Sequence, residues 1–445
     1  MLHAIPTEKL EGELGAWADE MTRAVSACVH CGFCLPTCPT YLELGEEMDS
    51  PRGRIVLMKG ALEGELGAEQ VAPHVDACLG CVACVTACPS GVRYGGLVTP
   101  FRSWLEARRR RPLVGRAWRF LLSRAMPHPR RFALLLAAGA PLRPIRHLLP
   151  RGLRAALELL PARGSAAVRE RTSVVRAVTA ASARPAERGT VALLRGCVQT
   201  VLAPELERTT VSVLRAFGYT VEVPPRQGCC GGLALHSGDL EQARALARRN
   251  LGAFDREVVA VVTNAAGCGS ALREAATLFA GTPDQDSARR LGARARDVAA
   301  LLAEALPAAF PAGLPPLSEP LRAVYHDACH LLHAQGERAA PRTLLRAIPG
   351  LELIEPAESE ICCGSAGTFN LEQPELADRL GERKARNLVA TGAQVVVAGN
   401  LGCALQIARH AERLGTPLEV LHTVDVVALA LAGEERRGVH PAATG

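Results

Sequence analysis

The hydrophobic residues of this 445-residue chain follow two different patterns. In the N-terminal part they recur at helical spacing, over residues 8–27 and 55–66, which predicts helices. In the C-terminal half, short β-branched runs alternate with longer Ala-, Leu- and Arg-rich segments such as 240–251 and 374–389. That alternation predicts βα units built on a largely parallel sheet.

Residues 101–189 lie between these two parts, and we predict that they form a helical connector. Seven prolines between residues 112 and 161 cut it into short helices, and residues 165–188 have the Ala, Ser and Arg content of a looser linker. The connector is strongly basic, with 18 arginines, no lysine and three acidic residues between residues 102 and 176. Such a segment can be a solvated surface, or it can face a protein partner or an anionic membrane, whereas we expect no nucleic-acid partner.

An internal duplication organises the C-terminal half. Each copy opens with an apolar run that ends in cysteine, continues to a Cys-Cys-Gly segment, and then has a second apolar run that leads to Asn and a further cysteine. Equivalent cysteines lie 132, 133 and 135 residues apart, in the pairs Cys197 and Cys329, Cys230 and Cys363, and Cys268 and Cys403. We therefore predict two α/β Cys-Cys-Gly domains, at residues 190–318 and 319–434, with a proline-rich boundary at 311–320.

Four cysteines in each copy are expected to come together. The carboxyl ends of parallel strands meet at one edge of the sheet, where the ligands of open α/β folds gather. The two sets are Cys197, Cys229, Cys230 and Cys268 in the first copy and Cys329, Cys362, Cys363 and Cys403 in the second. Four thiolates can hold a further iron–sulfur centre, act as a thiol/disulfide redox site or bind a structural zinc, and we favour the iron–sulfur centre.

Two cysteine motifs near the N-terminus carry the most specific chemistry. Residues 28–39 and 78–89 both read C-x₂-C-x₂-C-x₃-C-P, the spacing of ferredoxins that bind two [4Fe–4S] clusters. In such proteins the fourth cysteine of each run ligates the other cluster. This rule assigns to the first cluster Cys28, Cys31, Cys34 and Cys88, and to the second Cys38, Cys78, Cys81 and Cys84. Zinc sites take four ligands in all, and disulfides need an oxidising compartment, so neither explains the pattern.

The segment between the two motifs has helical spacing, whereas a compact ferredoxin joins its motifs by short strands and turns. We therefore predict an α-helical two-cluster ferredoxin domain at residues 1–100. Together with the connector and the two Cys-Cys-Gly domains, this makes the expected fold a multidomain α+β protein. Hydrophobic residues make up 48% of the chain and aromatic residues 4%, so its cores should consist mainly of Ala, Leu and Val.

The motifs of several other functions are missing from the sequence. No G-x-G-x-x-G follows a predicted strand, no P-loop occurs, and no Ser–His–Asp signature is evident. We see no flavin or nicotinamide site, assign no catalytic residue, and expect no substrate oxidation by this chain alone. No apolar run reaches the roughly 18 residues that span a bilayer, and residues 1–20 lack the apolar region of a signal peptide. We expect a cytoplasmic protein that can lie peripherally on the inner face of the cell membrane.

Three histidines, His326, His330 and His333, surround the first cysteine of the second copy, Cys329. The first copy has no counterpart beside Cys197. A metal role for His330 is one interpretation, but we favour capping or core hydrogen bonding for these side chains.

These features together resemble a known family, the iron–sulfur subunit of glycolate oxidase. The resemblance rests on the two C-x₂-C-x₂-C-x₃-C-P runs, on Pro51-Arg52-Gly53-Arg54 and on the two Cys-Cys-Gly regions, and it covers nearly the whole chain. Further matching segments are Cys88-Pro-Ser-Gly-Val-Arg-Tyr94, Cys362-Cys-Gly-Ser-Ala-Gly-Thr368 and Asn400-Leu-Gly-Cys403. Proteins of the same architecture include an iron–sulfur subunit of anaerobic glycerol-3-phosphate dehydrogenase, lactate-utilisation proteins and heterodisulfide reductase subunits.

The resemblance implies a complex. In it, a flavin-bearing subunit oxidises glycolate to glyoxylate, a second FAD-domain subunit accompanies it, and this chain carries electrons onward to a membrane quinone. Alternatives are the iron–sulfur subunit of a lactate or glycerol-3-phosphate dehydrogenase, or a heterodisulfide or thiol reductase. Heterodisulfide reductases end each domain in C-x-x-C and use five cysteines per unusual cluster. Here Ala271 and Gln406 stand at the last position, which argues for simpler centres and against disulfide reduction.

Overall fold

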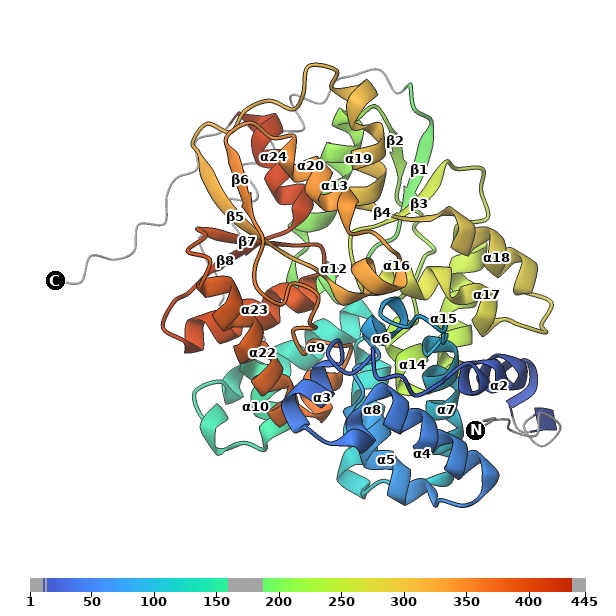
Figure 1. The fold of residues 1–445 in the computed structure, drawn as a ribbon. Helices are drawn as coiled ribbons and strands as arrows, with labels where there is room; N and C mark the ends of the chain where they lie inside the picture. The colour runs from blue at the N-terminus through green and yellow to red at the C-terminus, as the bar shows by residue number, and fades with distance from the viewer. Residues whose placement is uncertain (1–10, 13, 159–186, 434–445) are drawn as a thin grey trace.

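The structure is a computed structural model that describes residues 11–12, 14–158 and 187–433 (Figure 1). A helical ferredoxin region, the basic connector and two parallel sheets follow one another along the chain, which confirms the predicted multidomain combination of helical and α/β parts. Residues 8–10 of the expected first helix, and most of the expected linker at 165–188, lie outside the described residues. In Figure 1 the ferredoxin helices lie below the two sheets.

Every regular element between residues 11 and 158 of the described chain is helical. Those of the ferredoxin region are η1 (Gly15–Trp17), α2 (Ala18–Ser26), α3 (Pro39–Leu44), η2 (Glu47–Asp49), α4 (Pro51–Glu63), α5 (Ala68–Ala77), α6 (Ala83–Thr86) and α7 (Gly95–Arg108). Ser50 caps α4, where its hydroxyl accepts a hydrogen bond from the Gly53 N–H at 2.9 Å and Pro51 fills the first helical position. Met21 and Met58 lie fully buried in the core between these helices.

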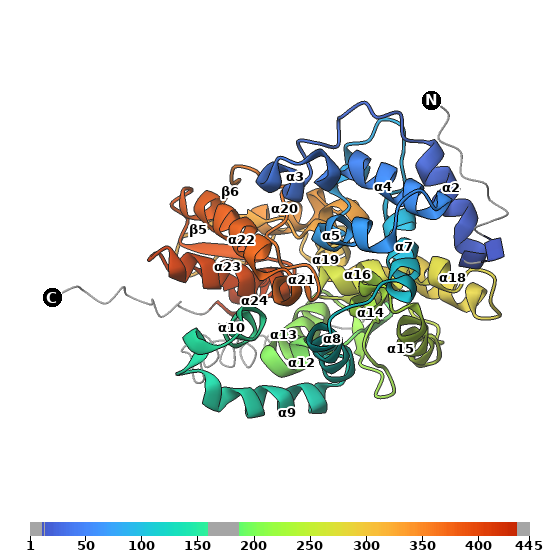
Figure 2. The ribbon, with the colours of Figure 1, turned by 90° about the horizontal axis from the view of Figure 1, so that it is seen from below.

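The basic connector forms short helices, as its prolines predict. They are α8 (Leu113–Ala125), α9 (Pro129–Gly139) and α10 (Arg151–Glu158), and the 3₁₀ turns η3 (Ala140–Leu142) and η4 (Arg146–Leu148) lie between α9 and α10. Figure 2 views the molecule from below, with α9 at one edge and the ferredoxin helices α3 and α4 at the opposite edge. The part of the connector around α9 therefore faces a different side of the molecule from these ferredoxin helices.

Each Cys-Cys-Gly domain contains a four-stranded parallel sheet, as predicted. The order is β2-β1-β3-β4 in the first sheet and β6-β5-β7-β8 in the second. The strands of the first are β1 (Thr190–Leu193), β2 (Thr220–Glu222), β3 (Ala260–Thr263) and β4 (Ala295–Asp297), and those of the second are β5 (Leu321–His326), β6 (Leu351–Ile354), β7 (Val395–Ala398) and β8 (Glu419–Leu421). All strands are parallel, and successive strands are added first on one side of β1 or β5 and then on the other. The β1/β3 and β5/β7 pairs are therefore the topological switch points, where such folds bind ligands.

Helices connect these strands and cover the sheets. In the first domain they are α12 (Gln199–Leu202), α13 (Glu205–Ala216), α14 (Gly232–Ser237), α15 (Leu240–Ala253), α16 (Ala266–Arg273), α17 (Ala275–Leu278), α18 (Gln285–Arg294) and α19 (Val298–Ala309). In the second they are η5 (His330–Ala334), α20 (Ala339–Arg346), α21 (Phe369–Glu372), α22 (Pro374–Val389), α23 (Leu401–Arg413) and α24 (Thr423–Ala432). The segment η5 is a single π-helical turn.

The two Cys-Cys-Gly domains share one hydrophobic core. Helix α13 of the first packs against α24 of the second, and α19 packs against α20. Leu193 and Leu302 of the first domain belong to the same buried cluster as Tyr325 and Val424 of the second. The duplicated halves are therefore fixed against each other by apolar burial, which is the main force that stabilises such contacts.

Candidate functional site

The two ferredoxin motifs fold into matching loops. His30 and Gly32 have φ angles of 55° and 89° in the first loop, and Gly80 and Val82 have φ angles of 66° and 52° in the second. The same two positions of each motif therefore have left-handed backbone, which costs free energy when the residue is not glycine. Both loops have this geometry, and each of them curves around a small cavity that its own cysteines line.

The structure brings together the cysteines that the sequence assigns to each cluster. One cavity, of 30 Å³, is lined by Cys28, Cys31, Cys34, Cys84 and Cys88. A second, of 20 Å³, is lined by Cys38, Cys78, Cys81 and Cys84. Cys88 thus lies beside the first loop and Cys38 beside the second, as the expected exchange of fourth cysteines requires. Ligation of clusters by these eight residues stays a prediction.

The second set of thiols fits a metal centre. Burial raises the pKa of the Cys81 and Cys84 thiols well above the usual value. Burial also acts to raise the pKa of Cys78, but the charges of Arg54 and Arg102 oppose it and leave that pKa below its usual value. Metal ligation requires deprotonated sulfur, and a bound cation compensates the burial of thiolate charge. An iron–sulfur cluster would supply that compensation here, with one-electron redox chemistry.

The two ferredoxin sets differ in their access to solvent. Cys31 of the first set is exposed, and the apolar side chains next to it, Val29 and Phe33, are 66% and 64% exposed. In the second set, Cys38, Cys78 and Cys81 are each less than a tenth exposed. The first set therefore lies at the surface and the second in the interior.

The Cys-Cys-Gly segments require glycine for two reasons. Gly231 and Gly364 have φ angles of 84° and 83°, in the left-handed region that suits glycine. A Cβ atom at Gly364 would also lie 2.8 Å from the carbonyl oxygen of Ala377, and one at Gly231 would lie 3.1 Å from that of Ala243. The missing side chain lets the cysteine pair turn toward the sheet while its loop packs on the following helix.

The four cysteines of the first Cys-Cys-Gly domain converge at the β1/β3 switch point. Cys197 follows β1, and Cys268 lies in the first turn of α16 after β3. The Sγ atoms of Cys197 and Cys229 are 3.3 Å apart, and those of Cys230 and Cys268 are 3.4 Å apart. The N–H group of Gly232 donates to Cys230 Sγ at 3.4 Å, a contact of the kind that tunes metal-bound sulfur. The set fits a thiolate-ligated centre.

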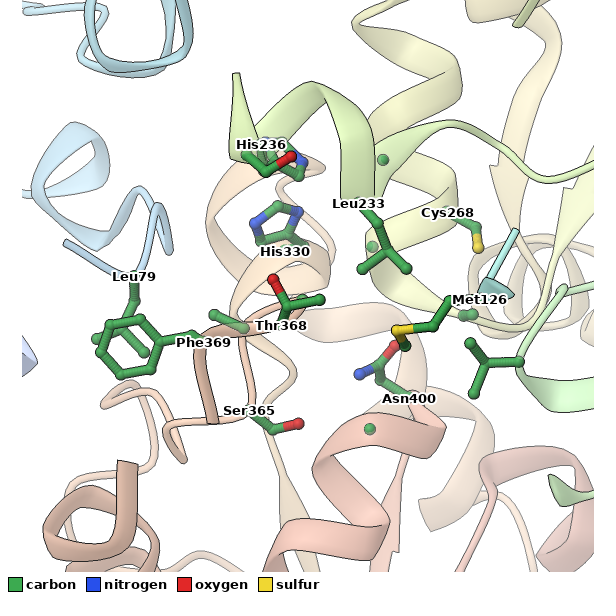
Figure 3. Close-up of a pocket in the computed structure, with 18 of the residues that line it drawn as sticks. Leu79, Met126, Leu233, His236, Cys268, His330, Ser365, Thr368, Phe369 and Asn400 are labelled. Carbon is green, nitrogen blue, oxygen red and sulfur yellow. The ribbon is translucent and has the colours of Figure 1, made fainter. Parts of the chain in front are cut away.

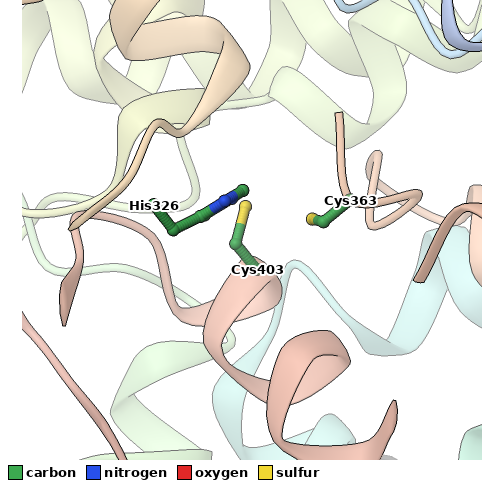
Figure 4. A group of neighbouring side chains, drawn as sticks. All are labelled: His326, Cys363 and Cys403. Atoms are coloured by element: carbon green, nitrogen blue, oxygen red, sulfur yellow. The ribbon is translucent and has the colours of Figure 1, made fainter. Parts of the chain in front are cut away.

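The second Cys-Cys-Gly domain repeats this arrangement and adds a histidine. The thiol groups of Cys329 and Cys363 flank that of Cys362 closely enough to raise its pKa well above the usual value. Cys363 and Cys403 also lie close to the imidazole of His326, and their ligand atoms are all within 4.8 Å of one another (Figure 4). The Asn400 amide donates to Cys403 Sγ at 3.3 Å.

A central cavity of 310 Å³ lies where the two Cys-Cys-Gly domains meet the ferredoxin region. Its walls include seven cysteines from three of the sets: Cys78, Cys197, Cys229, Cys230, Cys268, Cys329 and Cys403. Figure 3 shows Leu79, Leu233 and Phe369 among its apolar residues. His236 and His330 stack edge to face with ring centroids 5.1 Å apart, and burial lowers the pKa of both, so they are neutral near pH 7.

The second ferredoxin set lies against the second Cys-Cys-Gly domain. Cys81 and Cys362 belong to one buried apolar cluster, and Cys329 packs against it. His330 Nε2 lies 3.2 Å from the Gly80 carbonyl oxygen. After burial, the neighbouring charge of Cys329 is the largest cause of the raised pKa of Cys81. The two sites are therefore direct neighbours.

The sequence interpretation missed the position of His326. It placed this side chain among capping or core residues, whereas the structure puts it beside two of the predicted ligands. A signal was present, because His326 ends an apolar strand at a buried position, where the first copy has Leu194. Of the other two histidines, His330 faces the central cavity and His333 bonds to Thr86 at 2.8 Å.

Among the residues that the structure describes, no helix has the length and apolar character needed to cross a membrane.

Comparison with known proteins supports the iron–sulfur interpretation. The chain matches the model of a 4Fe-4S dicluster domain over residues 24–92, and it matches the model of a cysteine-rich domain twice, over residues 191–273 and 323–408. The two cysteine-rich matches confirm the duplication. The dicluster match confirms an iron–sulfur protein, while the number of clusters stays a prediction.

Two relatives align along nearly the whole chain, and others align along about half of it. The glycolate oxidase iron–sulfur subunit of Escherichia coli (strain K12) is 35% identical over 94% of this chain and 97% of its own length. A probable glycolate oxidase iron–sulfur subunit of Bacillus subtilis (strain 168) is 33% identical over 92% and 94%. Lactate utilization protein A of Oceanobacillus iheyensis is 29% identical over 53% of this chain and 96% of its own length. Because two relatives above 30% identity align over more than nine tenths of this chain and of their own length, this chain belongs to the family of glycolate oxidase iron–sulfur subunits.

Proposed function

We propose that this chain is the electron-transfer subunit of a complex that oxidises glycolate to glyoxylate. A partner subunit that carries FAD oxidises the substrate, and this chain passes the electrons on toward a membrane quinone. The glycolate oxidase names of its full-length relatives support the substrate, and the dicluster match supports the redox role. The chain acts within an oxidoreductase complex rather than as an enzyme by itself.

The observation that carries the proposal is a continuous series of thiol sites from the surface to the interior. The first ferredoxin set is exposed at Cys31, and the second set is buried. Cys81 of the second set shares an apolar cluster with Cys362 of a Cys-Cys-Gly site. Clusters held at these sites would differ in potential according to their hydrogen bonds, charge and exposure. This order favours electrons entering at the first set and leaving from the Cys-Cys-Gly region.

The surface around the first set suits a protein partner. Val29 and Phe33 are large apolar side chains that project beside the exposed Cys31. Arg52 anchors the same loop, since its Nη1 donates to the His30 carbonyl oxygen at 2.9 Å. Exposed apolar groups on a rigid loop are typical of contact sites. We assign this surface to the flavin-bearing partner.

The connector suits an anionic membrane surface. Seven of its large apolar side chains are exposed: Leu113, Val114, Phe120, Leu121, Leu134, Ile145 and Leu148. Exposed arginines lie among them: Arg116, Arg124, Arg130, Arg131 and Arg146. Apolar groups that enter the headgroup region next to cations that bind acidic lipids are the features of an interfacial helix. In Figure 2, α9 lies at the edge opposite α3 and α4, so lipid and flavin partner would bind different sides.

The test is a Cys84→Ser variant of this chain, purified anaerobically in complex with its partner subunits. Glycolate should still reduce the partner flavin in a single turnover, whereas reduction of a soluble quinone by glycolate should be lost. Ser26→Ala, at an exposed position of α2, serves as the control and should retain both activities. Quinone reduction at the wild-type rate by Cys84→Ser would contradict the relay. Flavin reduction by lactate or glycerol 3-phosphate, but not by glycolate, would contradict the substrate.

A further inference from the structure

We propose that His326 is a ligand of an iron–sulfur centre in the second Cys-Cys-Gly site, so that the two duplicated sites hold centres of different ligation. The inference rests on the part of the proposed function that places a redox centre in these sites. It adds a nitrogen donor to the four cysteines that the sequence supplies.

The position of His326 is that of a ligand. It is the last residue of β5, at the switch point beside β7, and it is 1% exposed. One of its ring nitrogens and the Sγ atoms of Cys363 and Cys403 all lie within 4.8 Å of one another (Figure 4). Imidazole nitrogen and thiolate sulfur are the donors that iron–sulfur centres use, including centres in which histidine replaces cysteine on one iron.

Apart from its closeness to the Cys363 and Cys403 thiols, the imidazole has no polar contact in the described structure that accounts for its position. Neither Nδ1 nor Nε2 of His326 has a hydrogen-bond partner there, although both atoms are buried. An unpaired buried polar group is costly, and histidines in protein cores normally donate at least one ring N–H. The other buried histidines of this domain behave in that way: His422 Nε2 lies 3.0 Å from the Asn264 carbonyl oxygen, and His333 bonds at both ring nitrogens. A metal ion would satisfy one of the two ring nitrogens of His326 that the protein leaves unpaired.

The first Cys-Cys-Gly site lacks this donor, and the strand register identifies the difference. Leu193 pairs with Val262 in the first sheet, and Tyr325 pairs with Val397 in the second. Cys197 follows Leu193 by four residues, as Cys329 follows Tyr325, so the next position is Leu194 in one copy and His326 in the other. Leu194 is 2% exposed and belongs to an apolar cluster. Within the described part of the chain, the first site therefore has no histidine donor at this position, and the second has a fifth donor.

The surroundings of the second site favour this arrangement. Lys384 is 2% exposed, and its Nζ donates to the Glu358 carbonyl oxygen at 2.6 Å. The nearby charges of Cys363 and Cys362 act to raise the pKa of Lys384 against the effect of burial. The amide of Asn400 donates to Cys403 Sγ. The positive charge of Lys384 offsets part of the negative charge of a centre, and the hydrogen bond from the Asn400 amide to Cys403 Sγ stabilises that charge; both effects raise the reduction potential of the centre.

The experiment uses the full-length wild-type chain in its complex, with histidine labelled by ¹⁵N. Pulsed EPR of the reduced centres should detect a strongly coupled nitrogen that changes from ¹⁴N to ¹⁵N with the label. The coupling should disappear in His326→Ala and in His326→Cys, while the signals of the ferredoxin clusters stay unchanged. His326→Cys restores a donor, so it should retain the iron of the wild-type protein and shift the potential of this one centre downward.

The matched control is His410→Gln, which changes another buried histidine, on α23, that bonds to Gln406. It should leave the nitrogen coupling intact. A centre in the second site with a full signal but no histidine nitrogen coupling in the wild-type protein would overturn the inference. A content of about eight iron atoms per chain would be enough only for two four-iron clusters. That result would overturn both the ligand role of His326 and the presence of centres in the Cys-Cys-Gly sites. Loss of quinone reduction in Cys84→Ser would still be expected then, so the two failures are distinguishable.

Discussion

The Nη1 atom of Arg54 lies 3.9 Å from the Sγ atom of Cys38, one of the predicted ligands of the second ferredoxin cluster. Arg54 is 1% exposed, and its Nη2 bonds to the Asp49 carboxylate at 3.2 Å. Its Nε donates to the His74 carbonyl oxygen at 2.6 Å. One buried guanidinium therefore joins α4 to the cysteine loop and places a fixed positive charge beside a thiol.

Replacing Arg54 by Met should lower both stability and potential. Asp49 would keep only the His74 imidazole, whose Nδ1 lies 3.1 Å from the carboxylate, and loss of the buried guanidinium should reduce the free energy of unfolding by about 3 kcal/mol. Loss of the positive charge should also shift the potential of the second cluster downward. Anaerobic urea unfolding and an EPR-monitored redox titration measure the two effects. Arg23→Met, which removes an exposed ion pair with Asp19, should change stability by less than about 1 kcal/mol. If the two variants have the same free energy of unfolding and the same cluster potential, Arg54 neither stabilises the fold nor tunes the cluster.

Adding a methyl group at Gly364 should damage one site selectively. Gly364→Ala would place Cβ against the Ala377 carbonyl oxygen in a left-handed conformation, at a cost of about 1–3 kcal/mol. We expect lower thermal stability and reduced iron in the second Cys-Cys-Gly site. Gly252→Ala is the matched control, because a Cβ there meets nothing within 4 Å and lies on the exposed face of α15. It should stabilise the protein by about 0.5–1 kcal/mol. Normal iron content in Gly364→Ala would contradict the close packing of this loop.

The carboxyl group of Asp297 should make stability depend on pH. Burial raises its pKa to about 7, and only Oδ1 has a partner, the Ala299 N–H at 2.8 Å. Between about pH 4 and 7 the unfolded chain has this group ionised while the folded chain keeps it protonated, since the unperturbed pKa is about 3.9. The free energy of unfolding should therefore fall as the pH rises through this range, by up to about 1.4 kcal/mol per unit, and level off above pH 7.

Asp297→Asn keeps the capping oxygen and cannot ionise. The difference in apparent melting temperature between this variant and wild type, measured anaerobically from pH 4.5 to 8, should grow in favour of the variant as the pH rises. The half-buried Glu274, whose pKa is also raised to about 7 by desolvation, titrates equally in both proteins and cancels in the difference. A constant difference across the range would mean that Asp297 is ionised in the folded state.

The apolar residues of the connector should govern lipid binding. Combined replacement of Leu113, Val114 and Phe120 by Ser should reduce sedimentation of the chain with vesicles that contain phosphatidylglycerol, by about tenfold or more. A tenfold loss of binding corresponds to about 1.4 kcal/mol. At about 25 cal/mol per Å² of buried apolar surface, the loss of three large apolar side chains from the contact exceeds that free energy. Binding of wild type should weaken with salt and be low on neutral phosphatidylcholine vesicles.

The control for lipid binding is Val259→Ser, at a side chain that is 57% exposed in the first Cys-Cys-Gly domain. It should bind vesicles like wild type. If the connector variant also binds like wild type, the membrane does not contact this surface. If it instead loses its partner subunits during purification, the surface contacts protein.

Much of the fold could be predicted because its signals are local. The two C-x₂-C-x₂-C-x₃-C-P runs and the duplicated Cys-Cys-Gly segments have fixed spacing, and the β-branched runs that became β3 and β7 end just before Asn264 and Asn400. Parallel pairing then brings the strand ends together without further information. These features were enough to predict two parallel sheets and the grouping of cysteines within each one.

The rest depends on packing between segments far apart in sequence. Nothing local indicates that Gly80 would contact His330, or that α13 and α24 would cover a common core. The burial of His326 likewise follows from its place between two sheet strands and two cysteine loops. The sequence places three histidines close to Cys329. Only the fold shows that His326 lies beside two thiols, whereas His330 and His333 contact other groups.

The shared core of the duplicated domains has a consequence for how the two sites can diverge. Two separate copies of one Cys-Cys-Gly domain that paired through the same helices would form a symmetric dimer, and any substitution would then occur in both sites at once. Because both copies lie in a single chain, Leu194 and His326 can occupy equivalent positions and still differ. Fusion thus frees each half to evolve its own ligand set while the interface holds the two sites at a constant separation.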